Sequence, residues 1–242
     1  MAESVTLLDG QVIADQPASG FRSGLDAVLL GASIKLKPDE FAIEMGCAAG
    51  AAMLVAAHHN PAARFTGIDA DEALIDLAEA NIVANGWGGR MRAVCRDIAA
   101  PDDPEPADQV FFNPPFYDDE TALKAPAEGK RAAFLSSGTP LPDWIGQAHK
   151  RLKSKGRLTL IHRADRLADI LSAMGSRFGD LAIKPVAPYA GKPAKRVLVS
   201  GRKGTKGPFT LLPPLVLHDG PDRKYAPEAE AILRGRARVV MG

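Results

Sequence analysis

The chain is poor in cysteine and has no long apolar run. Its two cysteines, Cys47 and Cys95, each lie inside an apolar stretch, so we expect small core residues rather than a disulfide. No group of cysteines and histidines has the spacing of a zinc site, and no run of about 18 apolar residues could cross a membrane. The first ten residues lack the basic and apolar segments of a signal peptide. We therefore expect a soluble cytoplasmic protein without a bound metal.

Charges of one sign are almost missing from two long segments, although the net charge of the 242 residues is only +1. Between Asp97 and Glu120 there are eight acids and no lysine or arginine. The segment Lys150–Lys206 has fifteen lysines and arginines against three acids. Such a basic segment is either a solvated surface with basic loops or a face that binds a polyanion such as RNA.

Short apolar runs alternate with amphipathic segments from residue 41 onward. Strands are predicted at 41–46, 63–70, 91–98, 108–113, 157–163, 181–188 and 195–202. The main helices are predicted at 49–60, 71–86, 141–156 and 164–178. This order is typical of an α/β fold, doubly wound, in which helices cover both faces of a mainly parallel, seven-stranded sheet.

The first 40 residues do not share this alternation. They predict a short hairpin around Asp9, followed by a helix with Ser23 as its N-cap and Asp26 in the N3 position of a capping box. We therefore divide the chain into an N-terminal extension, residues 1–40, and one large domain, residues 41–242.

Small residues follow the first predicted strand of the large domain. Gly46, Ala48 and Gly50 alternate there, two residues after Glu44. In a nucleotide-binding turn, such residues let a ligand approach the backbone and the N–H groups at the start of a helix. Here alanine stands in place of the middle glycine. A tight strand-to-helix turn without a ligand has the same pattern, and this motif alone leaves both interpretations open.

Acids follow the next two predicted strands. Asp69 lies 19 residues after Gly50, where a carboxylate can accept hydrogen bonds from both hydroxyls of a ribose. Asp71 is the better cap for the helix that follows, which leaves Asp69 to a ligand. Asp97 ends the third strand and could accept a hydrogen bond from an adenine amino group, with Ile98 against the ring. An exposed acid at a strand end is the alternative interpretation.

The fourth predicted strand ends in Asn113, Pro114, Pro115 and Phe116. Two prolines cannot continue a strand ladder, and they form a rigid corner. The Asn113 side-chain oxygen and the Pro114 carbonyl can then accept both hydrogens of one NH₂ group. Phe116 offers a flat face on which a base can stack. Because ligands of open α/β sheets lie at the carboxyl ends of the strands, all four motifs predict a single site that positions an amine.

Several segments resemble a known family. The stretches EMGCAAG, GIDADEALIDLAEANIVANG, RDI and FFNPPF, in this order, resemble class I S-adenosylmethionine-dependent methyltransferases of the kind that methylate planar amino nitrogens. The stretches GFRSGLDAVLLGAS, KRVLVSGRKG and LPPLVLHDGPDRKYAPEAEAIL are similar to the bacterial tRNA1(Val) adenine N6-methyltransferase family. The resemblance covers nearly the whole chain and implies a Rossmann-like methyltransferase fold.

The resemblance also implies roles for the motifs. Asn113 and Pro114 would hold the target amine, and Phe116 would stack on the base. The remaining residues would bind S-adenosylmethionine. In this role we expect Glu44, Gly46, Gly50, Asp69, Asp97 and Ile98 from the large domain, and Phe21, Arg22 and Asp26 from the extension, which would close over the cofactor.

Two features depart from the family pattern. Ala48 replaces a glycine, and we expect its extra methyl group to be tolerated. The polar segment 117–140 does not clearly match, and we predict that it is a loop that bears on the choice of substrate.

The predicted reaction is methyl transfer from S-adenosylmethionine to N6 of an adenine in tRNA, with the basic segment Lys150–Lys206 holding the RNA. Four alternatives remain at this point. They are N5-methylation of a protein glutamine, N2-methylation of an rRNA guanine, methylation of a small molecule, and RNA binding without catalysis.

Overall fold

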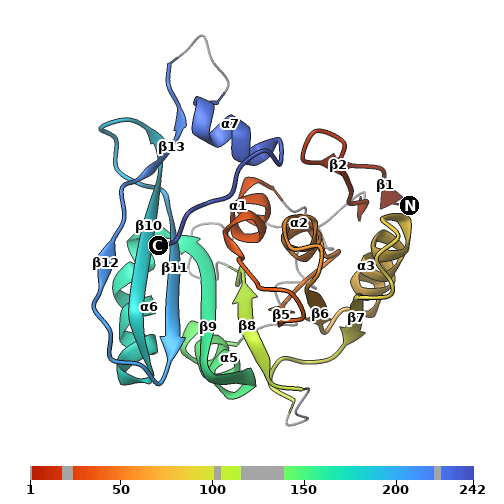
Figure 1. Cartoon of the computed structure of the whole chain (residues 1–242), viewed down its shortest axis with the longest axis horizontal. Helices are drawn as coiled ribbons and strands as arrows, with labels where there is room; N and C mark the ends of the chain where they lie inside the picture. The colour runs from red at the N-terminus through yellow and green to blue at the C-terminus, as the bar shows by residue number, and fades with distance from the viewer. Residues whose placement is uncertain (1, 18–23, 101–104, 116–138, 221–224) are drawn as a thin grey trace, which may run out of the picture.

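The computed structural model describes residues 2–17, 24–100, 105–115, 139–220 and 225–242. Nine strands form one sheet, and helices cover both of its faces (Figure 1). In spatial order the strands are β12 (Thr210–Leu211), β10 (Phe178–Tyr189), β11 (Arg196–Lys203), β9 (Leu152–Arg163), β8 (Ala107–Phe112), β5 (Phe41–Met45), β6 (Arg64–Asp69) and β7 (Met91–Cys95), and β13 (Leu215–His218) also pairs with β10.

The five strands β9, β8, β5, β6 and β7 are parallel to their neighbours in this order, and β11 is antiparallel to both β9 and β10. The predicted mainly parallel sheet of seven strands is confirmed. The short strands β12 and β13 extend it beyond β10.

The sheet buries apolar side chains on both faces. One core lies under α1 (Leu25–Ser33), α2 (Ala51–His59), α3 (Glu72–Ala84) and α7 (Pro227–Leu233), and the other lies under α5 (Leu141–Arg151) and α6 (Leu167–Met174). Phe111 belongs to the first core and its neighbour Phe112 to the second, since successive residues of a strand point to opposite faces. Two short 3₁₀ turns, η2 (Ala164–Arg166) and η3 (Gly175–Arg177), flank α6.

The predicted N-terminal hairpin is present, formed by β2 (Thr6–Leu7) and β3 (Val12–Ile13). It is flanked by the paired strands β1 (Ala2–Glu3) and β4 (Gln16–Pro17). Leu8 and Val12 are buried in the same core as α1 and α2, so the extension shares its core with the large domain.

The helix predicted to run to residue 156 ends earlier, at Arg151. Leu152 is extended, with ψ at 139°, and is the first residue of β9, where it is buried beside Ala107. Gly156 therefore does not end a helix. A Cβ atom at Gly156 would lie 2.9 Å from the Lys153 carbonyl oxygen within β9 and 3.2 Å from the Ala107 carbonyl oxygen of β8, so these close backbone contacts favour glycine here.

Three further predictions about local structure were wrong. The strand β7 ends at Cys95 rather than at residue 98, and Cys95 is exposed, whereas Cys47 is buried. The N-cap of α1 is Gly24, which places Asp26 at N2, and Asp26 forms an ion pair with a side chain of β11 instead of a capping box. Ser23 lies outside the described residues.

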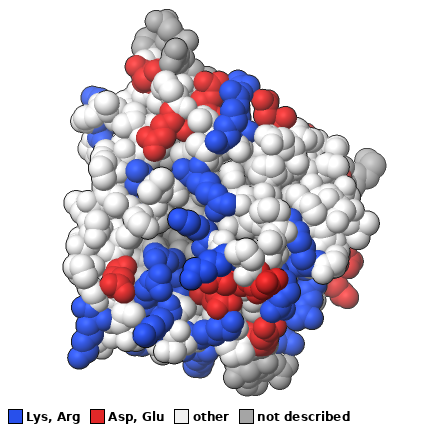
Figure 2. All heavy atoms as spheres, viewed as in Figure 1, with Lys and Arg blue, Asp and Glu red and all other residues white. Residues whose placement is uncertain are grey.

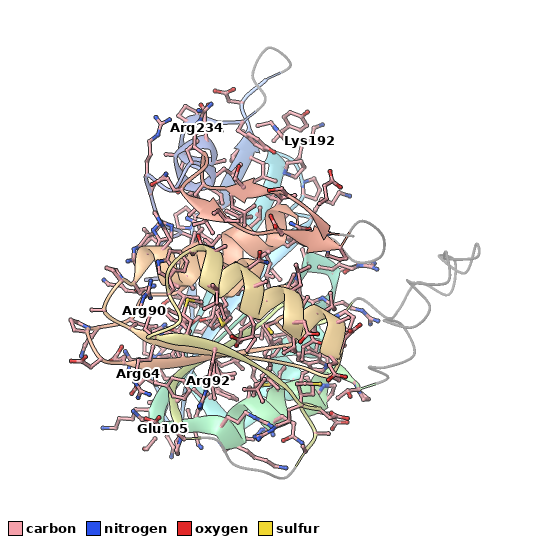
Figure 3. All side chains as sticks on the ribbon, turned by 90° about the vertical axis from the view of Figure 1, so that its right-hand side faces the viewer. Arg64, Arg90, Arg92, Glu105, Lys192 and Arg234 are labelled. Carbon is pink, nitrogen blue, oxygen red and sulfur yellow. The ribbon has the colours of Figure 1, made fainter. Side chains whose placement is uncertain are left out.

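Strand direction decides which loops can share a site. The carboxyl ends of β5, β6, β7, β8, β9 and β10 lie along one edge of the sheet, which we call the carboxyl rim. In Figure 3, Arg64 and Arg90, at the amino ends of β6 and β7, lie at the left, and Lys192, which follows β10, lies at the upper right.

Candidate active site

The loop between β5 and α2 is a tight turn of small residues. Gly46 and Gly50 have φ values of 65° and 85°, in the left-handed region that favours glycine. The Gly46 N–H donates to the Ile68 carbonyl of the neighbouring strand at 2.7 Å. A Cβ atom at Gly46 would lie 2.6 Å from Trp144 on α5, so this glycine is required both by its backbone and by the ring beneath it.

Ala48 has the same kind of backbone as the two glycines, with φ at 47°. Its N–H donates to Asp69 Oδ2 at 2.8 Å. Alanine at this position therefore costs about 1 kcal/mol relative to glycine, because a residue with a Cβ atom is strained in the left-handed region.

Asp69 ends β6 and organises the loop as well as facing the rim. Besides the bond from Ala48, its Oδ1 accepts the Asp71 N–H at 3.1 Å. Burial raises the pKa of the Asp69 carboxyl, while these backbone N–H groups favour its charged form. Asp71 caps α3 by accepting the N–H groups of Ala73 and Leu74, as predicted.

Glu44 lies under the loop. Its side chain is 3% exposed, and Oε2 accepts the N–H of Met53, in the first turn of α2, at 2.8 Å. Burial raises the pKa of this carboxyl well above its usual range, the Met53 N–H opposes the shift, and the charge of Asp69 adds to it. The structure thus places Glu44 where it holds the start of α2.

The corner after β8 is described as far as Pro115, which includes Asn113 and Pro114 of the predicted amine site. Asn113 follows Phe112, and Pro114 is buried. The Asn113 Oδ1 atom is buried, and no described residue donates a hydrogen bond to it. A buried acceptor without a partner costs about 1–3 kcal/mol, and a donor from a ligand would remove this cost.

The structure brings the candidate residues of four neighbouring strands together. Met45 is paired with both Phe112 and Ile68, and Asp69 is paired with Cys95. Gly46, Asp69 and Asn113 therefore lie at the ends of adjacent strands, about 4.8 Å apart from strand to strand.

Two further candidates lie just beyond β7. Asp97 is exposed, and its Oδ1 accepts the Ala99 N–H at 2.8 Å, so it begins a turn rather than ending a strand. Ile98, next to it, is 7% exposed and packs in the core under α5 and α6.

The candidates from the extension are less fully placed. Asp26 accepts a hydrogen bond from Arg196 Nε at 2.7 Å, which ties α1 to the first residue of β11. Phe21 and Arg22 lie outside the described residues, as do Phe116 and most of the predicted loop 117–140.

Two residues near the site were not singled out from the sequence. Trp144 is 3% exposed, its ring centroid is 5.3 Å from that of Phe112, and no described residue accepts a hydrogen bond from its Nε1. Asn81 is buried on α3, and its Nδ2 donates to the Ala49 carbonyl at 3.0 Å. Ala49 belongs to the loop between β5 and α2, residues 46–50, which we call the glycine-rich loop. The sequence offered one signal for Asn81: an asparagine at a helical position that faces the core needs hydrogen-bond partners there.

The basic segment Lys150–Lys206 is divided by the fold. Lys153 and Lys155 begin β9 and Arg202 ends β11, so they lie at the edge opposite to the carboxyl rim. A second group lies at the rim: Arg163, Arg166, Lys192, Lys195 and Arg196. On the face shown in Figure 2, lysines and arginines are interspersed with acids. The segment is therefore not one continuous basic face.

The described residues contain no cluster of three or more His, Cys, Asp or Glu side chains that could hold a metal ion. Within the same residues, each helix is too short or too polar to cross a membrane.

Comparisons with known proteins place the chain among methyltransferases. Residues 26–184 match the family model described as methyltransferase small domain. A tRNA1(Val) (adenine(37)-N6)-methyltransferase of Porphyromonas gingivalis is 30% identical over 228 residues, which cover 88% of each chain. A protein of the same name from Dickeya chrysanthemi is 28% identical over 224 residues, covering 87% of this chain and 85% of that protein.

Solved structures share the fold. A predicted O-methyltransferase of Agrobacterium tumefaciens has a TM-score of 0.73 and 27% identity, covering 89% of this chain and 98% of that one. The tRNA (m1A58) methyltransferase of Aquifex aeolicus has a TM-score of 0.59 and 15% identity, covering 83% of this chain and 77% of that one. At that identity the likeness concerns the fold alone.

Proposed function

This chain belongs to the methyltransferase small domain family, and we propose that it uses S-adenosylmethionine to methylate N6 of an adenine in tRNA. Relatives named as tRNA1(Val) (adenine(37)-N6)-methyltransferases align with most of the chain, and this supports the substrate. The site itself supports the reaction. A tRNA substrate also agrees with the cytoplasmic location expected from the sequence.

The single observation that carries the proposal is the buried, unpaired Asn113 Oδ1 beside the Pro114 corner, judged among the described residues. An acceptor with no donor of its own in the protein is expected to receive one from the substrate. Because the corner is next to the glycine-rich loop, an amine held there faces whatever that loop binds.

The residues of the rim fit S-adenosylmethionine. Gly46 and Gly50 would approach its methionyl part, because the loop backbone there has no side chain to hold a ligand away. Asp69 keeps lone pairs for the ribose hydroxyls beyond the two backbone N–H groups that it already accepts. Asp97 and Ile98 would contact the adenine.

When bound, S-adenosylmethionine supplies a methyl group on a positively charged sulfur, which the substrate nitrogen attacks. Asn113 Oδ1 and the Pro114 carbonyl would accept the two hydrogens of the adenine amine, so that its lone pair points at the methyl group. Phe116 would stack on the base. Catalysis then rests on positioning and on electrostatic stabilisation, and the methylated amine loses its extra proton to water.

The residues of the N-terminal extension would complete the cofactor site. Phe21 and Arg22 precede α1, and Asp26 is already fixed at the rim by Arg196. We propose that the segment leading into α1 closes over the cofactor from this anchor.

The test is transfer of label from methyl-labelled S-adenosylmethionine into a bacterial lysate that lacks this protein. Wild type is compared with Asn113→Ala and with Lys155→Ala, which changes a residue at the opposite edge of the sheet. We expect nuclease-sensitive label released as N6-methyladenosine. Loss of the acceptor should lower the rate about 10²–10³-fold. Lys155→Ala should act like wild type.

Cofactor affinity of the variants, measured by calorimetry, separates binding from transfer. It should be unchanged in Asn113→Ala, because Asn113 would contact the substrate amine. Protease-sensitive label would contradict the RNA substrate, and full activity of Asn113→Ala would contradict the role of this corner.

A further inference from the structure

Three aromatic rings form a cluster beside the end of β10. His218, the last residue of β13, stacks on Tyr225 with 5.3 Å between ring centroids and 17° between ring planes. Tyr189, the last residue of β10, also packs against His218, with 5.4 Å between their ring centroids. Tyr189 is 46% exposed, so one ring of this aromatic cluster is open to solvent.

The aromatic cluster lies on the carboxyl rim, at the same edge of the sheet as Asn113. The strand β10 runs in the same direction as β9 and β8, and β13 is parallel to β10 with Tyr189 paired to His218. Four strand spacings separate β8 from β13, and the register places Ile183 level with Phe112, so Tyr189 also lies several residues further along the sheet than Asn113. Together these offsets put the cluster roughly 25 Å from the corner at Asn113. A single RNA molecule can therefore reach both.

Basic side chains flank the cluster. The N–H of Lys192 donates to the Tyr189 carbonyl at 3.1 Å, so a tight turn keeps Lys192 next to the exposed ring. Lys195 follows in the same turn, with its N–H donating to Val186. Both lysines are exposed, and Figure 3 shows Lys192 on the side away from Arg64 and Arg90.

Two more cations lie between the cluster and the amine corner. Arg163, at the end of β9, is paired with Asp165, and Arg166 is paired with Asp169. Each of these acids is more than half exposed. Exposed pairs of this kind are weak and screened by salt, so a phosphate can compete with the carboxylate for the arginine.

We infer that the aromatic cluster is a stacking platform for an unpaired base of the RNA substrate, a base other than the one that is methylated. This inference rests on the proposed function. Single-stranded RNA is commonly held by bases stacked on aromatic side chains, while lysines and arginines contact the phosphates. Tyr189 would supply the open face, and Lys192 and Lys195 would contact the backbone of that nucleotide.

The alternative is that the three rings only anchor the connection from β13 to α7. Tyr189 separates the two ideas, because it is the most exposed of the three and its removal leaves the His218–Tyr225 stack in place. The test therefore compares Tyr189→Ala with Tyr189→Phe, which keeps the ring and removes only the hydroxyl.

The measurement is the dissociation constant for a labelled, unmodified valine tRNA transcript at fixed salt, together with the affinity for S-adenosylmethionine and the melting temperature. We expect Tyr189→Ala to bind the RNA about tenfold more weakly, within the range measured for one base–aromatic stack. Tyr189→Phe should bind as wild type does, and cofactor affinity should not change.

Lysine variants provide the matched control. Lys192→Ala should weaken RNA binding and reduce the slope of log affinity against log salt by about 1, as expected for one lost phosphate contact. Lys155→Ala, at the opposite edge, should change neither. Unchanged RNA binding in Tyr189→Ala, or an equal loss in Lys155→Ala, would overturn the inference.

The outcome is distinguishable from failure of the proposed function. Binding of RNA that depends on Tyr189, without transfer of label to RNA by the wild-type protein, would support the platform and contradict the methylation of tRNA. Methylation of RNA by the wild-type protein, with RNA binding that does not depend on Tyr189, would support the proposed function and contradict the platform.

Discussion

The N–H of Ala48 donates to Asp69 Oδ2 at 2.8 Å, and this bond joins the loop after β5 to the end of β6. One carboxylate thus shapes the loop before any ligand arrives. The bond requires Ala48 to keep a φ of 47°, a conformation that residues with a Cβ atom rarely adopt. The loop therefore carries a backbone cost at the centre of the proposed cofactor site.

The first prediction concerns this cost. Ala48→Gly should raise the free energy of unfolding by about 0.5–1 kcal/mol, because relief of the left-handed strain outweighs the greater entropy that glycine has in the unfolded chain. Urea unfolding at neutral pH measures it. Ala49→Gly is the matched control: Ala49 is the next residue but has no positive φ, so this change should destabilise the protein. Equal losses in both variants would contradict the account.

The second prediction concerns the buried carboxyl of Glu44. Burial raises its pKa in the folded state above the value in the unfolded chain, so the folded protein holds this proton more tightly. The stability that follows is fully present below the unfolded pKa of about 4.3 and is lost as the pH rises through the folded pKa. Glu44→Gln removes the charge and keeps an oxygen for the Met53 N–H.

The variant should therefore gain stability relative to wild type as the pH rises through that window. Unfolding of both proteins by urea at a series of pH values gives the difference directly. Asp69, whose pKa is also raised by burial, remains in both proteins, so its own contribution largely cancels. A difference that stays constant or shrinks with rising pH would contradict the assignment.

Much of the fold could be predicted from the sequence because the parallel strands are buried on both faces. Apolar runs such as 41–46 and 108–113, separated by helical segments, predict buried parallel strands. The structure has β5 and β8 at these places. The cap at Asp71 was predictable for a similar reason, since the carboxylate acts within three residues of its own position.

Features that depend on distant contacts could not be predicted in this way. The segment 152–156 has helix-forming residues, but Leu152 is buried beside Ala107 of β8, and that contact ends α5. The role of Trp144 depends on Gly46, about a hundred positions earlier in the sequence. The division of the basic segment follows from the antiparallel return of β11, which charge counting along the chain does not register.

The last prediction concerns Asn81, which joins the N-terminal extension to the glycine-rich loop. Its Oδ1 accepts the Asp15 N–H at 2.8 Å, and its Nδ2 donates to the carbonyls of Asp15 and Ala49 at 2.9 and 3.0 Å. One turn later, Asn85 holds both backbone groups of Ile13 in the same way, but within the described part of the chain it makes no hydrogen bond to the loop. The pair is thus a natural matched control.

Asn81→Ala leaves three backbone groups without their partner and should cost about 2–4 kcal/mol of stability. Asn85→Ala should cost a similar amount. Only Asn81→Ala should also weaken binding of S-adenosylmethionine, by roughly fivefold, because the bond to Ala49, worth about 1 kcal/mol, holds the loop that would contact the cofactor. Calorimetric titration of both variants below their melting temperatures measures this difference. Equal cofactor affinities would mean that Asn81 supports only the fold, whereas a loss confined to Asn81→Ala would make the extension and the cofactor loop one mechanical unit.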